Sequence, residues 1–146
     1  MHIRRAEIPD ASAVTDLALL LWPENDPQSL LADMLACIGG ADSAVFLAEE
    51  AGGPVAFAQC QLRHDYVEGT NRRPVGYLEG IYVREPHRRT GVARALLAAC
   101  VEWSRSHGCT QFASDCELDN TQSIAFHLGA GFQEANRLVC FVKDIL

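Results

Sequence analysis

The heptapeptide HRRTGVA, residues 87–93, joins a strand pattern to a helix pattern. The apolar run LEGIYV, residues 78–83, is typical of a β-strand, and residues 91–107 carry apolar side chains at helical spacing. Small residues in the first turn of a helix let an anion approach unpaired N–H groups, and the helix dipole favours negative charge. Arginines supply further cationic donors. The stretch therefore predicts a pyrophosphate site formed by Arg88, Arg89, Thr90, Gly91, Val92 and Ala93.

Two common nucleotide sites are excluded at this position. The chain contains no GxxxxGK[ST] run, which a Walker loop requires, and no GxGxxG run, which a dinucleotide-binding strand–turn–helix requires. The two arginines alone would also suit an ordinary basic turn at the start of a helix. Residues 87–93 taken by themselves leave these two interpretations open.

Outward from this stretch, the chain alternates strand and helix patterns. We expect strands over residues 3–8, 44–50, 55–62, 75–83, 110–115, 132–136 and 138–144. We expect helices over residues 9–21, 27–38, 91–107 and 120–128, with a polar loop over residues 64–74. Helices spread among strands indicate an α/β class (α+β mixed sheet) with three layers. The length of 146 residues indicates a single domain, 1–146.

Composition limits the classes of partner. The net charge of −7 argues against nucleic acid and permits a cationic substrate. No apolar run approaches the roughly 20 residues that cross a bilayer, so we expect no membrane partner. The six cysteines form no CxxC pair, so we expect reduced thiols and no metal. With no apolar leader pattern at the N-terminus, these features indicate a cytoplasmic protein.

Two separated motifs resemble one superfamily. Arg88-x-x-Gly91-x-Ala93 is similar to the Q/R-x-x-G-x-G/A signature of the Gcn5-related N-acetyltransferases, and Asn120 followed by Gly131–Phe132 is similar to their second half. The resemblance implies the three-layer fold of that superfamily and acetyl-CoA as co-substrate, with no metal. It also implies that residues 88–93 hold the pyrophosphate, that Asn120 contacts the cofactor, and that the pantetheine arm pairs with the backbone of Ile81, Tyr82 and Val83.

The position that follows Asn120 by seven residues departs from that pattern. Many members of the superfamily place there a tyrosine that protonates the leaving thiolate, whereas this chain has His127. Histidine can act as a general acid, and it can also be a structural residue of an amphipathic helix. A free N–H near Val83 could stabilise the oxyanion that forms during transfer.

Four further segments narrow the resemblance. LLWP (20–23), RHDYV (63–67), LEGI (78–81) and ASD (113–115) are similar to the aminoglycoside 6′-N-acetyltransferases of the small chromosomal kind, which confer antibiotic resistance. The resemblance implies a homodimer, in which the C-terminal strands or the 64–74 loop shape a shared pocket. It implies a substrate pocket lined by Trp22, Tyr66, Glu79, Asp115 and the residue at 136. That subfamily tends to have an acid where this chain has Asn136, and Glu134 could partly compensate.

The expected chemistry is direct transfer of an acetyl group to an amine. Glu79 helps to deprotonate the amine, Asp115 orients the cationic sugar, and His127 or water protonates coenzyme A. A carboxylate inside an apolar strand is costly without a role, which favours function for Glu79, whereas Trp22 could be core packing and Asp115 a turn cap. The alternatives are an N-acetyltransferase for a polyamine, a small arylalkylamine or a protein N-terminus, a non-catalytic acyl-CoA-binding module, and a structural domain with a basic helix cap.

Overall fold

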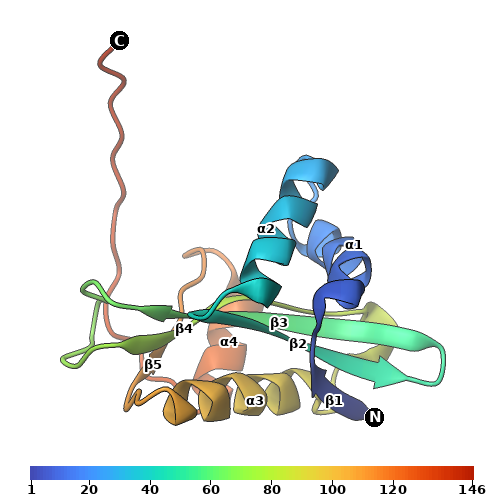
Figure 1. Ribbon diagram of the computed structural model, residues 1–146. Helices are drawn as coiled ribbons and strands as arrows, with labels where there is room; N and C mark the ends of the chain where they lie inside the picture. The colour runs from blue at the N-terminus through green and yellow to red at the C-terminus, as the bar shows by residue number, and fades with distance from the viewer.

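The computed structural model describes residues 1–146 and contains one five-stranded mixed sheet with four α-helices (Figure 1). The strands follow one another in the sheet in the order β1 (His2–Arg5), β2 (Ser43–Glu50), β3 (Gly53–Arg63), β4 (Val75–Val83) and β5 (Phe112–Ala113). The helices are α1 (Ala11–Leu21), α2 (Pro27–Gly39), α3 (Val92–Ser106) and α4 (Thr121–Gly129). Single 3-10 turns precede α1 at Ile8–Asp10 and α3 at Glu85–His87.

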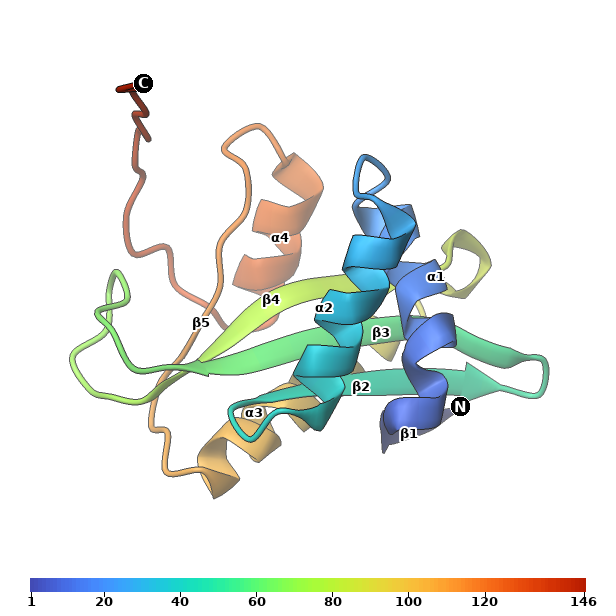
Figure 2. The ribbon, with the colours of Figure 1, turned by 45° about the horizontal axis from the view of Figure 1, so that its top comes forward.

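The sheet lies between two helical layers. Helices α1 and α2 cover one face, and α3 covers the other, which the two ribbon views show (Figures 1 and 2). Helix α4 is tied to α3 because Arg94 donates a hydrogen bond of 2.7 Å to the carbonyl oxygen of Gly129. The α/β class with a mixed sheet and three layers is confirmed.

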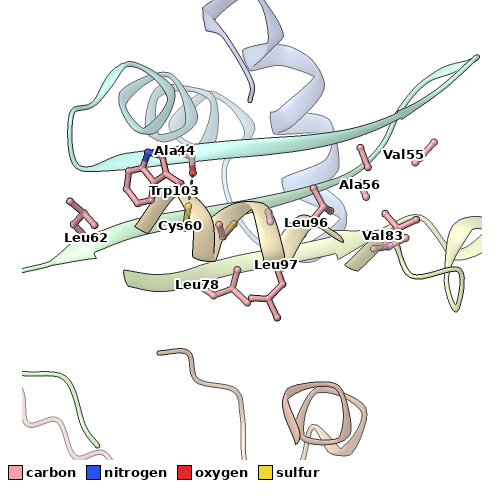
Figure 3. Close-up of a cluster of buried hydrophobic side chains, with 14 of the residues drawn as sticks. Ala44, Val55, Ala56, Cys60, Leu62, Leu78, Val83, Leu96, Leu97 and Trp103 are labelled. Atoms are coloured by element: carbon pink, nitrogen blue, oxygen red, sulfur yellow. Dashed lines mark hydrogen bonds between the residues drawn. The ribbon is translucent and has the colours of Figure 1, made fainter. Parts of the chain in front are cut away.

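The larger core lies between α3 and the sheet. Leu96, Leu97, Cys100 and Trp103 recur at helical spacing along α3 and pack on Cys60, Leu78 and other buried strand residues (Figure 3). Burial of a leucine side chain contributes about 2 kcal/mol, so this face fixes the position of α3 on β3 and β4. The helix that follows residues 87–93 is therefore rigidly placed.

Strand β4 has two irregularities that shape the functional region. Gln59 lies opposite Gly80 and Cys60 lies opposite Leu78, so Glu79 is an extra residue with no partner on β3. Such a β-bulge turns a side chain away from the regular alternation. On its other side, β4 pairs with β5 in parallel at Gly76 and Tyr77 only. The edge of β4 from Leu78 onward is therefore open.

Most expected elements are confirmed, with shifted ends. The strand expected over 75–83 has the observed bounds, and the one expected over 110–115 is reduced to Phe112–Ala113. The loop over residues 64–74 forms no strand or helix. None of the helices combines the length and the apolar character that a membrane crossing requires.

The two closing strands expected over 132–136 and 138–144 were wrong for this chain. Residues 132–146 form no secondary structure, and the segment after residue 137 extends away from the sheet (Figure 1). A strand needs a neighbour to satisfy its backbone groups, and no strand of this chain lies beside the segment. We call residues 138–146 the C-terminal arm.

Candidate active site

The N-terminus of α3 is open to an anion. Its cap residue is Gly91, which has a φ of 87° and no side chain to accept the first N–H groups. By contrast, Asp26 caps α2 and Asn120 caps α4 through side-chain oxygens. The first intrahelical bond runs from the N–H of Ala95 to the carbonyl of Gly91, which leaves the N–H groups of the first turn without helical partners. The predicted pyrophosphate loop therefore has the backbone geometry of an anion site.

The loop before α3 is held by its own hydrogen bonds. Thr90 Oγ1 donates to the carbonyl of His87 at 2.6 Å, and Arg89 has a left-handed φ of 64°, which is unusual for a residue other than glycine. A hollow lies against this loop, lined by Pro86, His87, Thr90, Gly91, Val92 and Ala95 together with Met1 and Glu50. The carboxylate of Glu50 lies 3.8 Å from the N-terminal ammonium, which offsets its charge. The hollow is thus lined by His87, Thr90 and the first residues of α3, and by neither arginine of the loop.

Arg88 links the loop to β4. Its Nε donates to the carbonyl oxygen of Val83 at 2.7 Å, and its guanidinium carbon lies 5.3 Å from the ring centre of Tyr82. In this position the side chain supports the loop from the strand side.

The open edge of β4 presents backbone groups beside the loop. The N–H of Arg84 donates to the carbonyl of Val55, which makes Ala56 and Val83 a pair without direct hydrogen bonds. The amide N–H of Val83 therefore points away from β3, toward the open edge, and alternation places the amide of Ile81 on the same side. The backbone of Tyr82 points toward β3. An extended chain rich in amides could add to this edge as a further strand.

His127 is fixed on α4 by both ring nitrogens. Nδ1 lies 2.6 Å from the carbonyl oxygen of Ser123, and Nε2 lies 2.8 Å from Oγ of Ser114. The contact with a carbonyl requires a proton on Nδ1. The ring also packs edge-on against Phe132, with 5.0 Å between ring centres. His127 therefore lies directly beyond the end of β5, at the fork between β4 and β5.

Asn120 has a structural contact of its own. Its Oδ1 accepts the N–H of Ser123 at 3.1 Å and so caps α4. The amide nitrogen is not used by this cap.

The two acids predicted for the substrate pocket are joined through two other side chains. Nε of Arg63 lies 3.1 Å from one carboxylate oxygen of Glu79, and Nη2 lies 2.9 Å from each oxygen. The guanidinium carbon of Arg63 lies 3.6 Å from the ring centre of Tyr77, whose hydroxyl donates to Asp115. Burial, together with the hydrogen bond to Asp115, raises the pKa of Tyr77 well above its usual range, so the phenol stays protonated. The structure thus brings Glu79 and Asp115 into one network.

Trp22 lies beside this network on the same face of the sheet. It follows α1 directly, packs edge-on against Phe57 with 6.2 Å between ring centres, and covers Gly80. Tyr66 lies in the 64–74 loop with 62% of its surface exposed, and the guanidinium carbon of Arg73 lies 5.7 Å from its ring centre. Aromatic rings of this kind can pack on the apolar faces of sugars.

Asn136 is attached to the 64–74 loop. Its Nδ2 donates to Oε1 of Glu68 at 2.7 Å, and a Cβ on Gly69 would lie 2.5 Å from Cβ of Ala135. Glu134 instead accepts a hydrogen bond from Nε of Arg137, and both side chains are exposed. Glu134 and Asn136 do not lie on a common strand, because residues 132–136 form no secondary structure.

Arg63 and Tyr77 are the residues that sequence reasoning missed. Arg63 ends β3 and begins the RHDYV segment but was given no role there, and Tyr77 lies in the interior of the apolar strand β4. One signal was available: Tyr77 and Glu79 alternate along one strand, and an arginine ends the strand paired to it.

Comparisons with known proteins agree with this geometry. Residues 11–132 match the acetyltransferase (GNAT) family. The chain is 46% identical over 140 residues to an aminoglycoside N(6′)-acetyltransferase type 1 from Stenotrophomonas maltophilia, covering 95% of this chain and 90% of the relative. It is 37% identical to the enzyme of that name from Acinetobacter haemolyticus, covering 99% of each.

Solved structures have the same fold. AAC(6′)-Iy in complex with the bisubstrate analog CoA-S-monomethyl-acetylneamine superposes with a TM-score of 0.94 at 35% identity, covering 98% of this chain and 97% of the other. AAC(6′)-Ih from Acinetobacter baumannii superposes with a TM-score of 0.92 at 36% identity, covering 99% and 98%. The resemblance carried by residues 88–93, Asn120 and Gly131–Phe132 is thereby confirmed. The chain belongs to the acetyltransferase (GNAT) family, and aminoglycoside N(6′)-acetyltransferases are among its relatives.

Proposed function

We propose that this chain transfers an acetyl group from acetyl-CoA to the 6′-amine of aminoglycosides and so confers antibiotic resistance. One observation carries the proposal: an uncapped helix N-terminus and an open strand edge lie next to a network that holds two carboxylates, Glu79 and Asp115. The helix N-terminus and the open strand edge suit coenzyme A, and the two carboxylates suit a polycationic sugar. The names of relatives at 36–46% identity support the same substrate class.

The donor half of the site binds coenzyme A through the backbone. The first-turn N–H groups of α3, with Arg88, Arg89, Thr90, Gly91, Val92 and Ala93, hold the pyrophosphate. The open edge at Ile81, Tyr82 and Val83 pairs with the pantetheine arm, with Ile81 and Val83 supplying the outward-facing groups. The N–H of Val83 stabilises the thioester oxygen as negative charge develops on it, and Asn120 supplies a further cofactor contact.

The acceptor half binds the amine and removes its proton. Asp115 and Glu79 attract the ammonium groups, and Trp22, Tyr66 and Asn136 form the walls of the pocket. Glu79, directly or through water, takes the proton that makes the amine nucleophilic. The leaving thiolate takes a proton from His127 or from water, and the Nε2 atom that would deliver the proton of His127 contacts Oγ of Ser114.

The decisive measurement is coenzyme A release with two sets of acceptors. Aminoglycosides that carry a 6′-amine should be acetylated, and those with a 6′-hydroxyl should not. Acetylation of both sets would contradict the assigned position. Acetyl-CoA binding without turnover on any amine would favour the non-catalytic module.

The active form we propose is a homodimer. Each of the large apolar side chains of the C-terminal arm is at least about two-thirds exposed, an unusual loss of hydrophobic burial for a single chain. Pairing of the arm with a second copy would bury these side chains and satisfy the strand groups that this chain leaves open. The hydrogen bond from Asn136, at the base of the arm, to Glu68 of the 64–74 loop supports a dimer contact beside the proposed acceptor pocket.

Four further expectations complete the proposal. Residues 1–146 act as one N-acetyltransferase domain, and the chain works in the cytoplasm, which its six free cysteines favour. The net charge of −7 speaks against nucleic acid as a partner, and no membrane partner is expected.

A further inference from the structure

Arg63 occupies a place in the acceptor site that the assigned roles do not use. It ends β3, and its guanidinium spans from the carboxylate of Glu79 to the ring face of Tyr77. Both terminal contacts are close, at 2.9 Å to each Glu79 oxygen and 3.6 Å to the ring centre. This arrangement uses the planar fork and the stacking face of arginine together, which lysine cannot reproduce.

The two acids of the site consequently differ in their partners. Glu79 faces a cation, whereas the partner of Asp115 is the neutral hydroxyl of Tyr77. The negative charge of Glu79, at the bulge, is thus balanced by Arg63, whereas the charge of Asp115, beyond β5, is not balanced in this way. Glu79, Asp115 and Arg63 together carry a single negative charge.

This difference has a chemical consequence for an amine acceptor. An unbalanced carboxylate stabilises an ammonium ion and so opposes its deprotonation, while a balanced one does so less. An acceptor with several ammonium groups needs attraction at one point and a neutral amine at another. Asp115 provides the environment that attracts an ammonium group. Glu79, paired with Arg63, provides the one that suits a neutral amine, and the two acids are joined through Arg63 and Tyr77.

We infer that Arg63 is a positioning and specificity-determining residue, which fixes the Glu79 carboxylate for proton removal and sets the charge that the acceptor meets. This inference rests on the proposed function. The other titratable groups of this network are Tyr77 on β4, whose ring lies under the Arg63 guanidinium, and Asp115 after β5, which accepts a hydrogen bond from Tyr77. None of them is a cation, so Arg63 is the group that balances Glu79.

The test compares R63M and R63K with the wild type on two acceptors that share a primary amine. One is a kanamycin-type aminoglycoside, and the other is a 6-amino-6-deoxyglucoside with a single charge. In R63M the site gains a net negative charge, so KM for the polycation should fall roughly threefold relative to KM for the monoamine. The kcat for both should fall about tenfold, because the Glu79 carboxylate is no longer held.

R63K separates charge from geometry. It should restore the wild-type ratio of the two KM values, while kcat stays reduced because the fork and the stacking are lost. In the E79Q background, R63M should lower kcat no further, since Arg63 acts through Glu79. R105M is the matched control: it removes one positive charge from the exposed Arg105–Glu102 pair on α3 and should leave both quantities unchanged.

The outcomes distinguish this inference from the proposed function. If the wild type releases coenzyme A with neither of the two acceptors, both this inference and the proposed function are overturned. A wild type that turns over, while R63M keeps the KM ratio and kcat, overturns this inference alone, as does an equal shift of the ratio in R105M. If R63M does not fold, judged by thermal melting, full kcat in R63K overturns the inference.

Discussion

Gly80 lies directly against the indole ring of Trp22: a Cβ on Gly80 would stand 2.6 Å from both Cζ2 and Cη2 of the ring. No real Cβ is accommodated at that distance, so the absence of a side chain at Gly80 lets α1 end against β4. The contact lies one residue from Glu79. A backbone feature of the strand therefore sets the position of Trp22, which we propose as a wall of the acceptor pocket.

Replacing Gly80 with alanine should displace Trp22. Overpacking of this kind costs about 1–3 kcal/mol, and the moved indole should raise KM for the aminoglycoside more than KM for acetyl-CoA. Thermal melting and steady-state kinetics check both effects. G52A is the control, because a Cβ at Gly52 meets nothing within 4 Å. Unchanged kinetics in G80A would contradict the place given to Trp22.

Gly91→Ala should weaken acetyl-CoA binding through the backbone alone. A Cβ at Gly91 has open space, but its φ of 87° is unfavourable for alanine by about 1 kcal/mol. The strain should loosen the first turn of α3 and raise the Kd of acetyl-CoA severalfold in calorimetry. G108A pays the same penalty at φ 88°, beyond the other end of α3. G108A should lose similar stability while its Kd for acetyl-CoA stays unchanged. An equal Kd in G91A and G108A would contradict the anion site.

Glu79→Gln should lower kcat about a hundredfold at neutral pH, which is the usual contribution of a general base. The amide keeps the shape of the side chain but accepts no proton from the amine. E102Q, an exposed carboxylate that pairs with Arg105 on α3, should leave kcat unchanged. Full kcat in E79Q would remove Glu79 from the role of base.

Asp10 should give the fold a specific dependence on acid. Hydrogen bonds from Arg4 and from the N–H of Glu7 lower its pKa to about 2, against 3.8 in the unfolded chain. Its stabilising effect is complete above pH 3.8 and is lost as the pH falls through 2. D10N should cost about 1 kcal/mol at pH 7, allowing for solvent screening, and the difference from wild type should vanish near pH 2.

The control for this pH effect is E134Q. Glu134 pairs with Arg137 at the exposed base of the arm, where an ion pair adds little to stability. Urea unfolding at several pH values measures both variants. A D10N difference that does not decline in acid would contradict the role of the Arg4 contact.

The local sequence pattern predicted those structural features that depend on residues close together in the chain. The bounds of β4 and the start of α3 were predicted because proline, glycine and apolar periodicity mark them within residues 74–93. The pairing of Arg63 with Glu79 was not predicted, because it depends on the register of β3 on β4 and on a bulge at Glu79. Both depend on how β3 and β4 meet, which the residues of β4 alone do not specify.

The C-terminal arm shows the other limit: its alternating apolar residues led to a strand prediction that was wrong, because a strand also needs a partner strand, which the alternation does not supply. If that partner is a second copy, Phe141→Asp should convert a dimer into a monomer, because it puts a charge into the buried interface. Light scattering coupled to size exclusion measures the mass, and L128D, at an exposed leucine of α4, is the matched control. We expect the wild type and L128D to be dimeric, and F141D to be monomeric with a higher KM for the aminoglycoside. A monomeric wild type would contradict the dimer, and an unchanged KM in monomeric F141D would show that the pocket is complete in one chain.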